Sequence, residues 1–182
     1  MEKLQKLSMD ELQRKSPEEC RQSEKIPVII VLDNVRSLYN IGSIFRTADA
    51  FLVTSVYLCG ISACPPHREI HKTALGAEDT VSWKYFETTM QAVDELQQNN
   101  YALWGVEQTR NSVSLETFTA APDIRYAFIF GNEVRGVDQK ALDQCEGCIE
   151  IPQFGAKHSF NVSVSAGIVL WECYRQMFYR KT

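Results

Sequence analysis

Three separate segments of this chain carry the residues that are best suited to chemistry. The first, residues 32–51, ends an apolar run in polar residues and places Asn40 and Arg46 on a predicted helix. We expect Asn40 to be the N-cap of that helix, since its side chain can accept a backbone hydrogen bond. An arginine on the buried side would need an anionic partner, because an unpaired buried charge is costly. The alternative is an ordinary capped helix with a solvated arginine.

The second segment, residues 126–138, is a predicted strand followed by a turn with the pattern Gly-Asn-Glu-x-x-Gly. It resembles the glycine turn after a nucleotide-binding strand, where small residues let the backbone approach a ligand. The pattern is not GxGxxG, however, and no acidic partner follows at the usual distance. The segment therefore argues against a dinucleotide-dependent dehydrogenase, and a purely structural tight turn is the alternative to a binding site.

The third segment, residues 149–176, predicts a short strand, a loop and a long amphipathic helix. Ser159 and Asn161 are both suited to cap the helix, and the small residues after them permit close packing. A helix needs one N-cap, so capping explains the presence of either Ser159 or Asn161 but not of both. Capping does not account for the presence of Lys157 and His158 together with Ser159 in the same loop.

The elements that must position these segments follow from the alternation of short apolar runs with amphipathic stretches after residue 26. Alternating strands and helices predict an α/β fold, a parallel sheet with helices on both faces. Ligands bind such sheets beyond the carboxyl ends of the strands. Polar or turn residues occupy the ends of four predicted strands there, at 33–34, 107–108, 131–133 and 152–155. The predicted strands are 27–33, 53–59, 80–86, 101–107, 124–131 and 148–152, and the predicted helices lie near 41–51, 70–77, 88–98, 137–145 and 161–178.

Length and composition predict one domain with a short appendage. With 182 residues and 45% hydrophobic content, the chain can bury one core. Residues 1–25 are charged, with Leu4, Leu7 and Leu12 at loosely helical spacing, and predict an appended helical arm before a domain of residues 26–182. No apolar run reaches the roughly 20 residues of a membrane span, and the charged start is unlike a signal peptide. We expect a cytoplasmic protein that does not bind membranes.

Charge limits a nucleic-acid function to one part of the surface. The net charge of −4 gives the whole chain no attraction to a polyanion, so RNA binding needs a local basic face. Acidic residues concentrate in the N-terminal arm and in residues 87–95, which predicts that such a face lies elsewhere. Five aromatic side chains fall within predicted strands or the last helix, where we expect them to pack in the core: Trp83, Phe86, Trp104, Phe128 and Trp171. Tyr39 and Phe154, on predicted loops, are candidates for contact with a base or with adenine.

Two cysteine patterns are interpreted as structural. Cys59, Cys64, His67 and His71 lie close together, but their spacing fits no standard zinc site and a Pro-Pro pair stiffens the middle, so no metal is expected. Residues 145–148 form a CxxC pattern across a predicted helix end and turn, where a glycine cap is the better explanation. We expect all six cysteines to be reduced thiols.

Taken together, the three segments resemble the three motifs of the SpoU family of RNA 2′-O-ribose methyltransferases, in the SPOUT superfamily, and occur in the same order. The matching residues are Asn40 and Arg46, the GNExxG of 131–136, and Ile-Pro at 151–152 followed by SFNVSVSAG at 159–167. The resemblance covers residues 26–182. It implies an α/β fold with a deep C-terminal trefoil knot, S-adenosyl-L-methionine as cofactor, and an active site completed across a homodimer.

The resemblance also implies roles for individual residues. Deprotonating an arginine at neutral pH would cost roughly 7 kcal/mol, so we prefer Arg46 as a stabiliser of the ribose alkoxide and an anchor for the adjacent phosphate, with general base as the alternative. The implied catalytic residues are Arg46, Asn40, Glu133, Ser159 and Asn161. The implied cofactor-binding residues are Gly131, Ile151, Phe160, Gln153 and Phe154. The candidates for RNA binding are Arg36, Arg68, Lys72, Arg110, Arg135 and Lys157.

The family is also known for different RNA substrates. Because residues 1–25 are the one candidate extension, and no separate N-terminal RNA-binding domain is evident, we expect tRNA rather than rRNA as the substrate. The alternative function is a non-catalytic RNA-binding or assembly protein that kept the SPOUT fold. The complete set of Asn40, Arg46, Glu133, Ser159 and Asn161 argues against it, because a protein that only binds RNA would not need all five.

Overall fold

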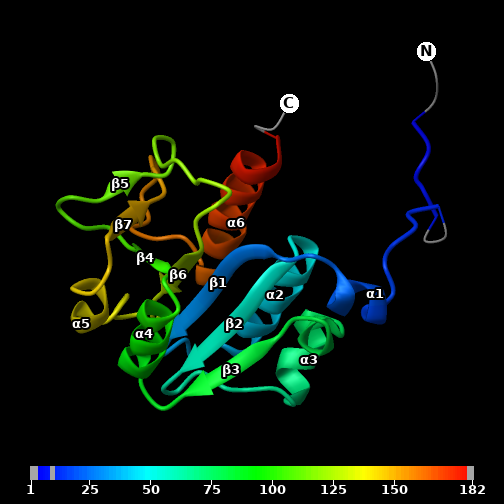
Figure 1. Cartoon of the computed structure of the whole chain (residues 1–182), viewed down its shortest axis with the longest axis horizontal. Coiled ribbons are helices and arrows are strands. Elements are labelled where there is room, and N and C mark those ends of the chain that lie inside the picture. The colour runs from blue at the N-terminus through cyan, green and yellow to red at the C-terminus, as the bar shows by residue number, and fades with distance from the viewer. Residues whose placement is uncertain (1–3, 9–10, 180–182) are drawn as a thin grey trace.

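The computed structural model describes residues 4–8 and 11–179, and it is built on one parallel sheet (Figure 1). The strand order is β3-β2-β1-β6-β4-β7-β5, and every strand pair is parallel, which confirms the predicted α/β class. Six of the strands match predicted ones, while the two-residue β5 was not predicted. The strands are β1 (Ile26–Asp33), β2 (Val53–Cys59), β3 (Trp83–Phe86), β4 (Ala102–Val106), β5 (Val113–Ser114), β6 (Tyr126–Phe130) and β7 (Gly147–Glu150).

Helices cover both faces of the sheet, as the alternation of elements predicted. Along β1, Val28 and Ile30 face one core with residues of α2, α3 and α6, while Ile29 and Val31 face a second core with residues of α4 and α5. This division follows from the twofold alternation of side chains along a strand. The helices are α1 (Pro17–Gln22), α2 (Leu38–Ala50), α3 (Arg68–Ala74), the 3₁₀ helix η1 (Ala77–Asp79), α4 (Thr89–Gln98), α5 (Gln139–Leu142) and α6 (Val162–Tyr179).

The N-terminal arm is less helical than its leucine spacing predicted. Residues 4–8 and 11–16 form no helix, and Leu4 and Leu7 are exposed. The arm has one short helix, α1, which begins after Ser16 with a reciprocal capping box to Glu19. Leucines that find no core to pack against cannot stabilise a short helix. The predicted positions at residues 1–3 and 9–10 lie outside the described residues.

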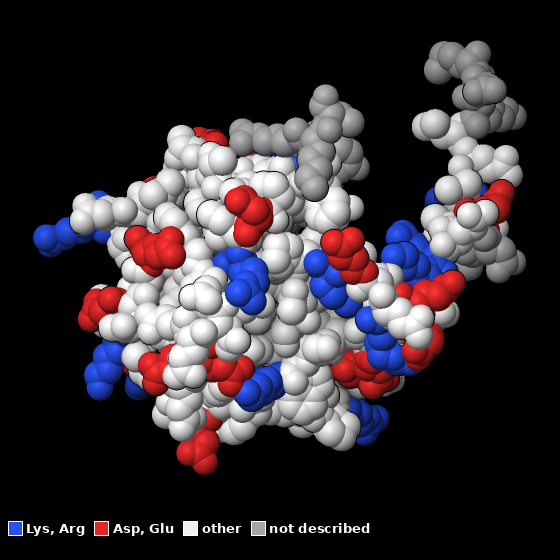
Figure 2. Space-filling view, in the orientation of Figure 1, with Lys and Arg blue, Asp and Glu red and all other residues white. Residues whose placement is uncertain are grey.

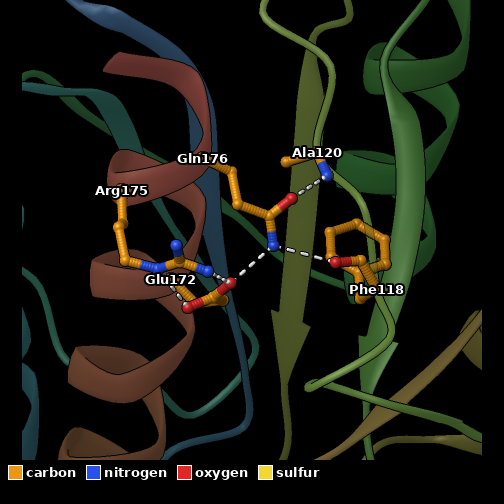
Figure 3. A network of polar contacts seen from close by, with 5 residues as sticks. All are labelled: Phe118, Ala120, Glu172, Arg175 and Gln176. Carbon is orange, nitrogen blue, oxygen red and sulfur yellow. Dashed lines mark hydrogen bonds and ion pairs between the residues drawn. The ribbon is translucent and has the colours of Figure 1, made fainter. Parts of the chain in front are cut away.

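Helix α6 is anchored deep in the molecule near its C-terminal end (Figure 3). The Gln176 side chain is buried, accepts a hydrogen bond from the backbone N–H of Ala120 at 2.8 Å, and donates one to the carbonyl of Phe118 at 2.8 Å. It also donates to the Glu172 carboxylate, which binds the Arg175 guanidinium. These contacts join α6 to the connection between β5 and β6, while its other side packs on α2.

Two tryptophans contradict their predicted core positions. Trp83, on the edge strand β3, is 37% exposed, and Trp171, on α6, is 50% exposed although its ring contacts that of Phe51. Both side chains lie at the outside of the described fold, Trp83 on a strand at the edge of the sheet and Trp171 on the exposed side of a helix. Among the described residues, no helix has both the length and the apolar character that crossing a membrane requires.

Candidate functional site

A cavity of about 580 Å³ lies beyond the carboxyl ends of β4, β6 and β7, where the fold class predicted a ligand. The last residues of these strands form its floor, and two loops form its walls. We call residues 131–138 the first wall and residues 151–161 the second wall. The residues that line the cavity are Val106, Glu107, Gln108, Phe130, Gly131, Asn132, Glu133, Val134, Arg135, Gly136, Ile149, Glu150, Ile151, Gln153, Ser159, Phe160, Asn161, Val162 and Ser165.

The first wall is a tight turn whose glycines are required by its geometry. The backbones of Asn132 and Gly136 exchange two hydrogen bonds, so the chain folds back directly onto Gly131. A Cβ at Gly131 would lie 2.0 Å from the carbonyl carbon of Gly136, and Gly136 itself has a φ of +69°. The Asn132 side chain accepts from the N–H groups of Val134 and Arg135. The GNExxG pattern is thus explained by the turn.

Glu133 connects the first wall to the start of α2. Its carboxylate accepts hydrogen bonds from the backbone N–H groups of Arg36 and Ser37, both at 3.0 Å, and from Asn40 Nδ2 at 3.1 Å. Partial burial opposes ionisation of this carboxyl, but these bonds and one from its own backbone outweigh it and lower the pKa of Glu133 below its ordinary value. The carboxylate is therefore ionised and fixed in place.

The predicted N-cap of α2 was wrong. The helix begins at Leu38, and Ser37 is its cap, with the serine hydroxyl accepting a hydrogen bond from the backbone of Asn40. Asn40 lies within the first turn, where its amide is free to reach across to Glu133 and to accept from Asn161 Nδ2 at 3.1 Å. The side chain that we assigned to capping instead links the three motif segments.

The second wall contributes fewer contacts. Gln108 donates from its side chain to the carbonyl of His158 at 2.7 Å. Asn161 accepts from the backbone of Ser163 at 2.9 Å and so caps α6, which confirms one of the two predicted caps. Ser159 lines the cavity, and residues 154–161 are all exposed. The hydrogen bond from Asn161 to Asn40 completes the junction of the three segments.

Two predicted site residues lie apart from this junction. Arg46 is on an exposed face of α2, does not line the cavity, and makes no hydrogen bond or ion pair with the described residues. Phe154 is 95% exposed and is also not a lining residue. The other predicted cofactor residues, Gly131, Ile151, Gln153 and Phe160, all line the cavity.

The predicted RNA-binding cations are all on the surface. The face of the molecule shown in Figure 2 has no separate basic region of the kind that we expected. On that side, positive and negative side chains are interspersed. Arg135 lines the cavity, whereas Lys72 forms an ion pair with Glu69 at 2.6 Å. The exposed candidates are Arg36, Arg68, Lys72, Arg110, Arg135 and Lys157.

Carboxylates at the strand ends are the residues that the motif comparison missed. Asp33, 1% exposed, accepts a hydrogen bond from the backbone of Asp138 at 2.7 Å, and Glu107 accepts one from Val137 at 3.1 Å. Glu150 accepts from the Ser112 hydroxyl. These carboxylates hold the loops of the site. Asp33 and Glu107 are the last residues of two predicted strands, at strand ends that the sequence analysis had noted as polar, whereas Glu150 lies inside a third predicted strand and had no such signal.

The cysteine patterns offer no competing chemistry within the described part of the chain. No group of three or more His, Cys, Asp or Glu residues is arranged to hold a metal ion there. Burial raises the pKa of the Cys145 thiol to about 12, so the thiolate that redox chemistry requires is disfavoured.

Comparison with known proteins identifies the family. The model of the SpoU rRNA methylase family matches residues 27–171. The chain is 32% identical over 150 residues to the 23S rRNA (guanosine-2′-O-)-methyltransferase RlmB of Neisseria meningitidis, an alignment that covers 82% of this chain and 59% of that protein. This chain thus spans about three fifths of the length of that relative.

Solved structures share the fold. The TrmH/SpoU tRNA modifying enzyme of A. aeolicus superimposes with a TM-score of 0.80 at 24% identity, over 91% of this chain and 82% of that one. The SpoU methyltransferase AviRb of Streptomyces viridochromogenes, solved in complex with AdoMet, gives a TM-score of 0.77 at 20% identity, over 87% and 64% of the two chains. With the family model matching most of its length, the chain belongs to the SpoU rRNA methylase family.

Proposed function

We propose that this chain transfers a methyl group from S-adenosyl-L-methionine to a ribose 2′-hydroxyl of RNA. Family membership supports the reaction class, and the Neisseria relative bears the name of a guanosine 2′-O-methyltransferase. The observation that carries the proposal is the hydrogen-bonded set Asn40–Glu133–Asn161 at the cavity, which joins three segments far apart in the sequence. If residues 131–136 served only as a tight turn, hydrogen bonds of Asn40 with Glu133 and Asn161 beside a cavity would not be expected.

The cavity fits the proposed cofactor. Its volume of about 580 Å³ falls within the roughly 300–1,000 Å³ of small-molecule sites. Its floor is apolar at Val106 and Ile149, while Glu107 and Glu150 give the rim negative charge, which suits a cationic sulfonium. S-adenosyl-L-methionine supplies the transferable methyl when bound. The residues proposed to hold it are Gly131, Ile151, Gln153, Phe160 and, after closure of the second wall, Phe154.

The proposed contribution of the protein is alignment and charge stabilisation. Asn40 is fixed by Glu133 and Asn161, so its amide is held in one orientation beside the cavity. With Ser159, these polar groups would orient the ribose hydroxyl, which is where most of the rate gain of a displacement reaction arises. Arg46 would stabilise the alkoxide as its proton leaves, and would bind the neighbouring phosphate. No metal is required for this chemistry.

We propose that the active form is a homodimer in which Arg46 acts at the cavity of the partner. The guanidinium is exposed and does not line the cavity of its own chain. Helix α6 also exposes Val164, Trp171 and Phe178, which are spaced by seven residues and therefore form one apolar stripe. A second copy that covers this stripe would remove it from water.

Complementation between two inactive variants tests this arrangement. Arg46→Ala keeps an intact cavity, and Asn161→Ala keeps an intact arginine. Mixed dimers prepared by co-expression should recover part of the wild-type rate, whereas each variant alone should be nearly inactive. A chain that sediments as a monomer, or mixed dimers as inactive as the single variants, would overturn the proposal.

We further propose the deep trefoil knot of the family. β7 lies three strands from β1, yet α6, which follows β7, packs on α2 beside β1, so the chain turns back across the sheet. Gln176 attaches α6 to the connection before β6. Tracing residues 107–179 in an experimental density map tests the threading. An α6 that joins the fold without passing through a loop would refute it.

We propose tRNA as the substrate and the cytoplasm as the location. Within the described residues all six cysteines are unpaired, which suits a reducing compartment.

Wild-type protein with methyl-labelled S-adenosyl-L-methionine should label bulk tRNA more than rRNA, and nuclease digestion should return 2′-O-methylnucleosides. Arg46→Ala should abolish transfer, and Arg46→Lys should restore only a small part of it. Tight RNA binding without transfer from bound cofactor would favour the non-catalytic alternative, and base-methylated products would contradict the chemistry.

A further inference from the structure

A second pocket, of about 520 Å³, lies at the opposite end of the sheet, and shares no lining residue with the first cavity. It is formed by the loop before α3, by α3 itself, by η1 and by the start of the edge strand β3. We call it the α3–β3 pocket. The residues that line it are Pro65, Pro66, His67, Arg68, His71, Glu78, Asp79 and Trp83.

One wall of the α3–β3 pocket holds a buried carboxylate with a free acceptor. The Glu78 side chain is only 8% exposed. Its Oε1 lies 2.5 Å from Nδ1 of His71, while Oε2 is buried and has no hydrogen-bond partner among the described residues. A buried acceptor without a partner is costly, and most buried polar atoms in folded proteins are paired. Because Glu78 also lines the pocket, a ligand group that enters this wall could supply the missing donor to Oε2.

An aromatic surface lines the same pocket. Trp83 is 37% exposed on an edge strand, with no further strand to cover it. Its indole shares the pocket with the rings of Pro65 and Pro66. An exposed indole can stack on a nucleobase, because every base has a face that can stack.

Two side chains at the pocket can bind a phosphate. Arg68 is exposed and makes no hydrogen bond or ion pair with the described residues. His67 accepts a hydrogen bond at Nδ1 from the backbone of Glu69, so the ring proton lies on Nε2 and remains available. Arginine in particular matches the geometry of phosphate oxygens.

We propose that the α3–β3 pocket binds one unpaired nucleotide of the RNA substrate, with its base on Trp83, its phosphate on Arg68 and His67, and an exocyclic amino group donating to Glu78 Oε2. This inference rests on the proposed RNA substrate and adds a positioning subsite to it. Cytosine suits the pocket better than uracil. The two bases differ at position 4, where cytosine has an amino donor and uracil a carbonyl that would face the carboxylate.

One RNA strand would occupy both this pocket and the active site. Residues 60–67 run from the carboxyl end of β2 to the pocket, and the N–H of Ile61 donates to Asn34 Oδ1 at the carboxyl edge of the sheet. Eight residues span at most about 29 Å when fully extended, so the pocket lies within that distance of this edge. A nucleotide held at Trp83 would therefore set which ribose of the same strand reaches Asn40.

Tryptophan fluorescence tests the pocket directly. The chain has three tryptophans, so Trp104→Phe combined with Trp171→Phe leaves Trp83 as the sole indole. Oligocytidylate should quench this emission at about tenfold lower concentration than oligouridylate. Glu78→Gln should remove most of that preference, because an amide can pair with either base. Absence of quenching by either RNA, or equal affinity for both in the unaltered pocket, would overturn the inference.

A second measurement covers the case in which the double variant does not fold. In the otherwise unchanged chain, Trp83→Leu should raise the KM for RNA about tenfold and leave the heat of cofactor binding unchanged. Tyr85→Leu, on the same edge strand but outside the pocket, is the matched control and should keep the KM. Methyl transfer with an unaltered KM in Trp83→Leu would refute this subsite alone, whereas quenching of Trp83 without any cofactor binding would refute the proposed function alone.

Discussion

The two walls of the cavity are held in very different ways. The first wall, residues 131–138, is fixed from several directions: Glu133 binds the start of α2, Asp33 binds the backbone of Asp138, and Glu107 binds that of Val137. In the second wall, residues 154–160 are all exposed, and within the described part of the chain only Gln108, which donates to the carbonyl of His158, forms a hydrogen bond with them.

This difference indicates that the two walls have different roles in ligand binding. Carboxylates that accept several backbone hydrogen bonds hold the first wall in its final geometry before any ligand arrives. The second wall has few buried contacts to oppose local opening, so it belongs to the part of a structure that a ligand can order. We therefore expect the first wall to determine alignment and the second to close over the cofactor.

The largest expected effect comes from removing the Gln176 side chain, which joins α6, the helix that follows the second wall, to the connection between β5 and β6. Gln176→Ala would leave the buried N–H of Ala120 and carbonyl of Phe118 without partners, at a cost of about 3 kcal/mol in the free energy of unfolding. Urea denaturation of the wild type and of this variant measures it. Gln97→Ala, at an exposed helical position, is the matched control. A loss below about 1 kcal/mol would show that the network in Figure 3 is not an anchor.

A smaller effect is expected from the first wall. Glu133→Gln should lower the free energy of unfolding by about 2 kcal/mol at neutral pH. The substitution replaces the charged acceptor of three hydrogen bonds by a neutral amide, and water can compensate for part of this loss. Glu116→Gln, at an exposed position, is the control.

The same variant should show a defined pH dependence. The pKa of Glu133 is lowered from 4.5 in the folded chain, so its stabilisation is complete above pH 4.5. It is lost as the pH falls through the lowered pKa. The stability difference between wild type and Glu133→Gln should therefore be constant from pH 7 to pH 5 and shrink in more acidic urea titrations. A difference that grows with acidity would contradict the assignment.

The smallest expected effect concerns the second wall alone. Trypsin should cut after Lys157, and S-adenosyl-L-methionine at ten times its Kd should slow that cut about tenfold, because only the free fraction remains open. Cleavage after Lys15 in the N-terminal arm should be unchanged and serves as the internal control. The variant Lys157→Gln lacks this cleavage site, so the fragment that is absent from its digest is the product of cleavage after Lys157. Equal protection at both sites, or none at Lys157, would mean that the second wall does not close over the cofactor.

The sequence was sufficient to predict the sheet, its helices and the edge at which the site lies. Runs such as residues 27–33 are apolar throughout because they are buried on both faces, and this pattern is local. The two-residue β5 was missed because its pairing with β7 depends on a partner distant in sequence. The exposure of Trp83 and Trp171 could not be predicted for a similar reason, since it depends on which elements lie at the edge of the molecule.

Within the site, residue types were predictable but their partners were not. Asn40 was assigned as a cap because the motif places it near a helix start, yet the structure gives that role to Ser37. The Asn40 amide instead donates a hydrogen bond to the carboxylate of Glu133, 93 positions away in the sequence. The position of Arg46 outside its own cavity could likewise not be derived from helical spacing alone. Hydrogen bonds between distant segments follow from the fold rather than from any local pattern.

The most direct test of the account is calorimetric titration of the pure protein with S-adenosyl-L-methionine and with its demethylated product, S-adenosylhomocysteine. The account predicts heat with both ligands, one site per chain, and loss of that heat in Gly131→Val, whose side chain would fill space now taken by the backbone of Gly136. Absence of heat with either ligand in the folded wild-type protein would contradict the proposed cavity and the reaction that depends on it.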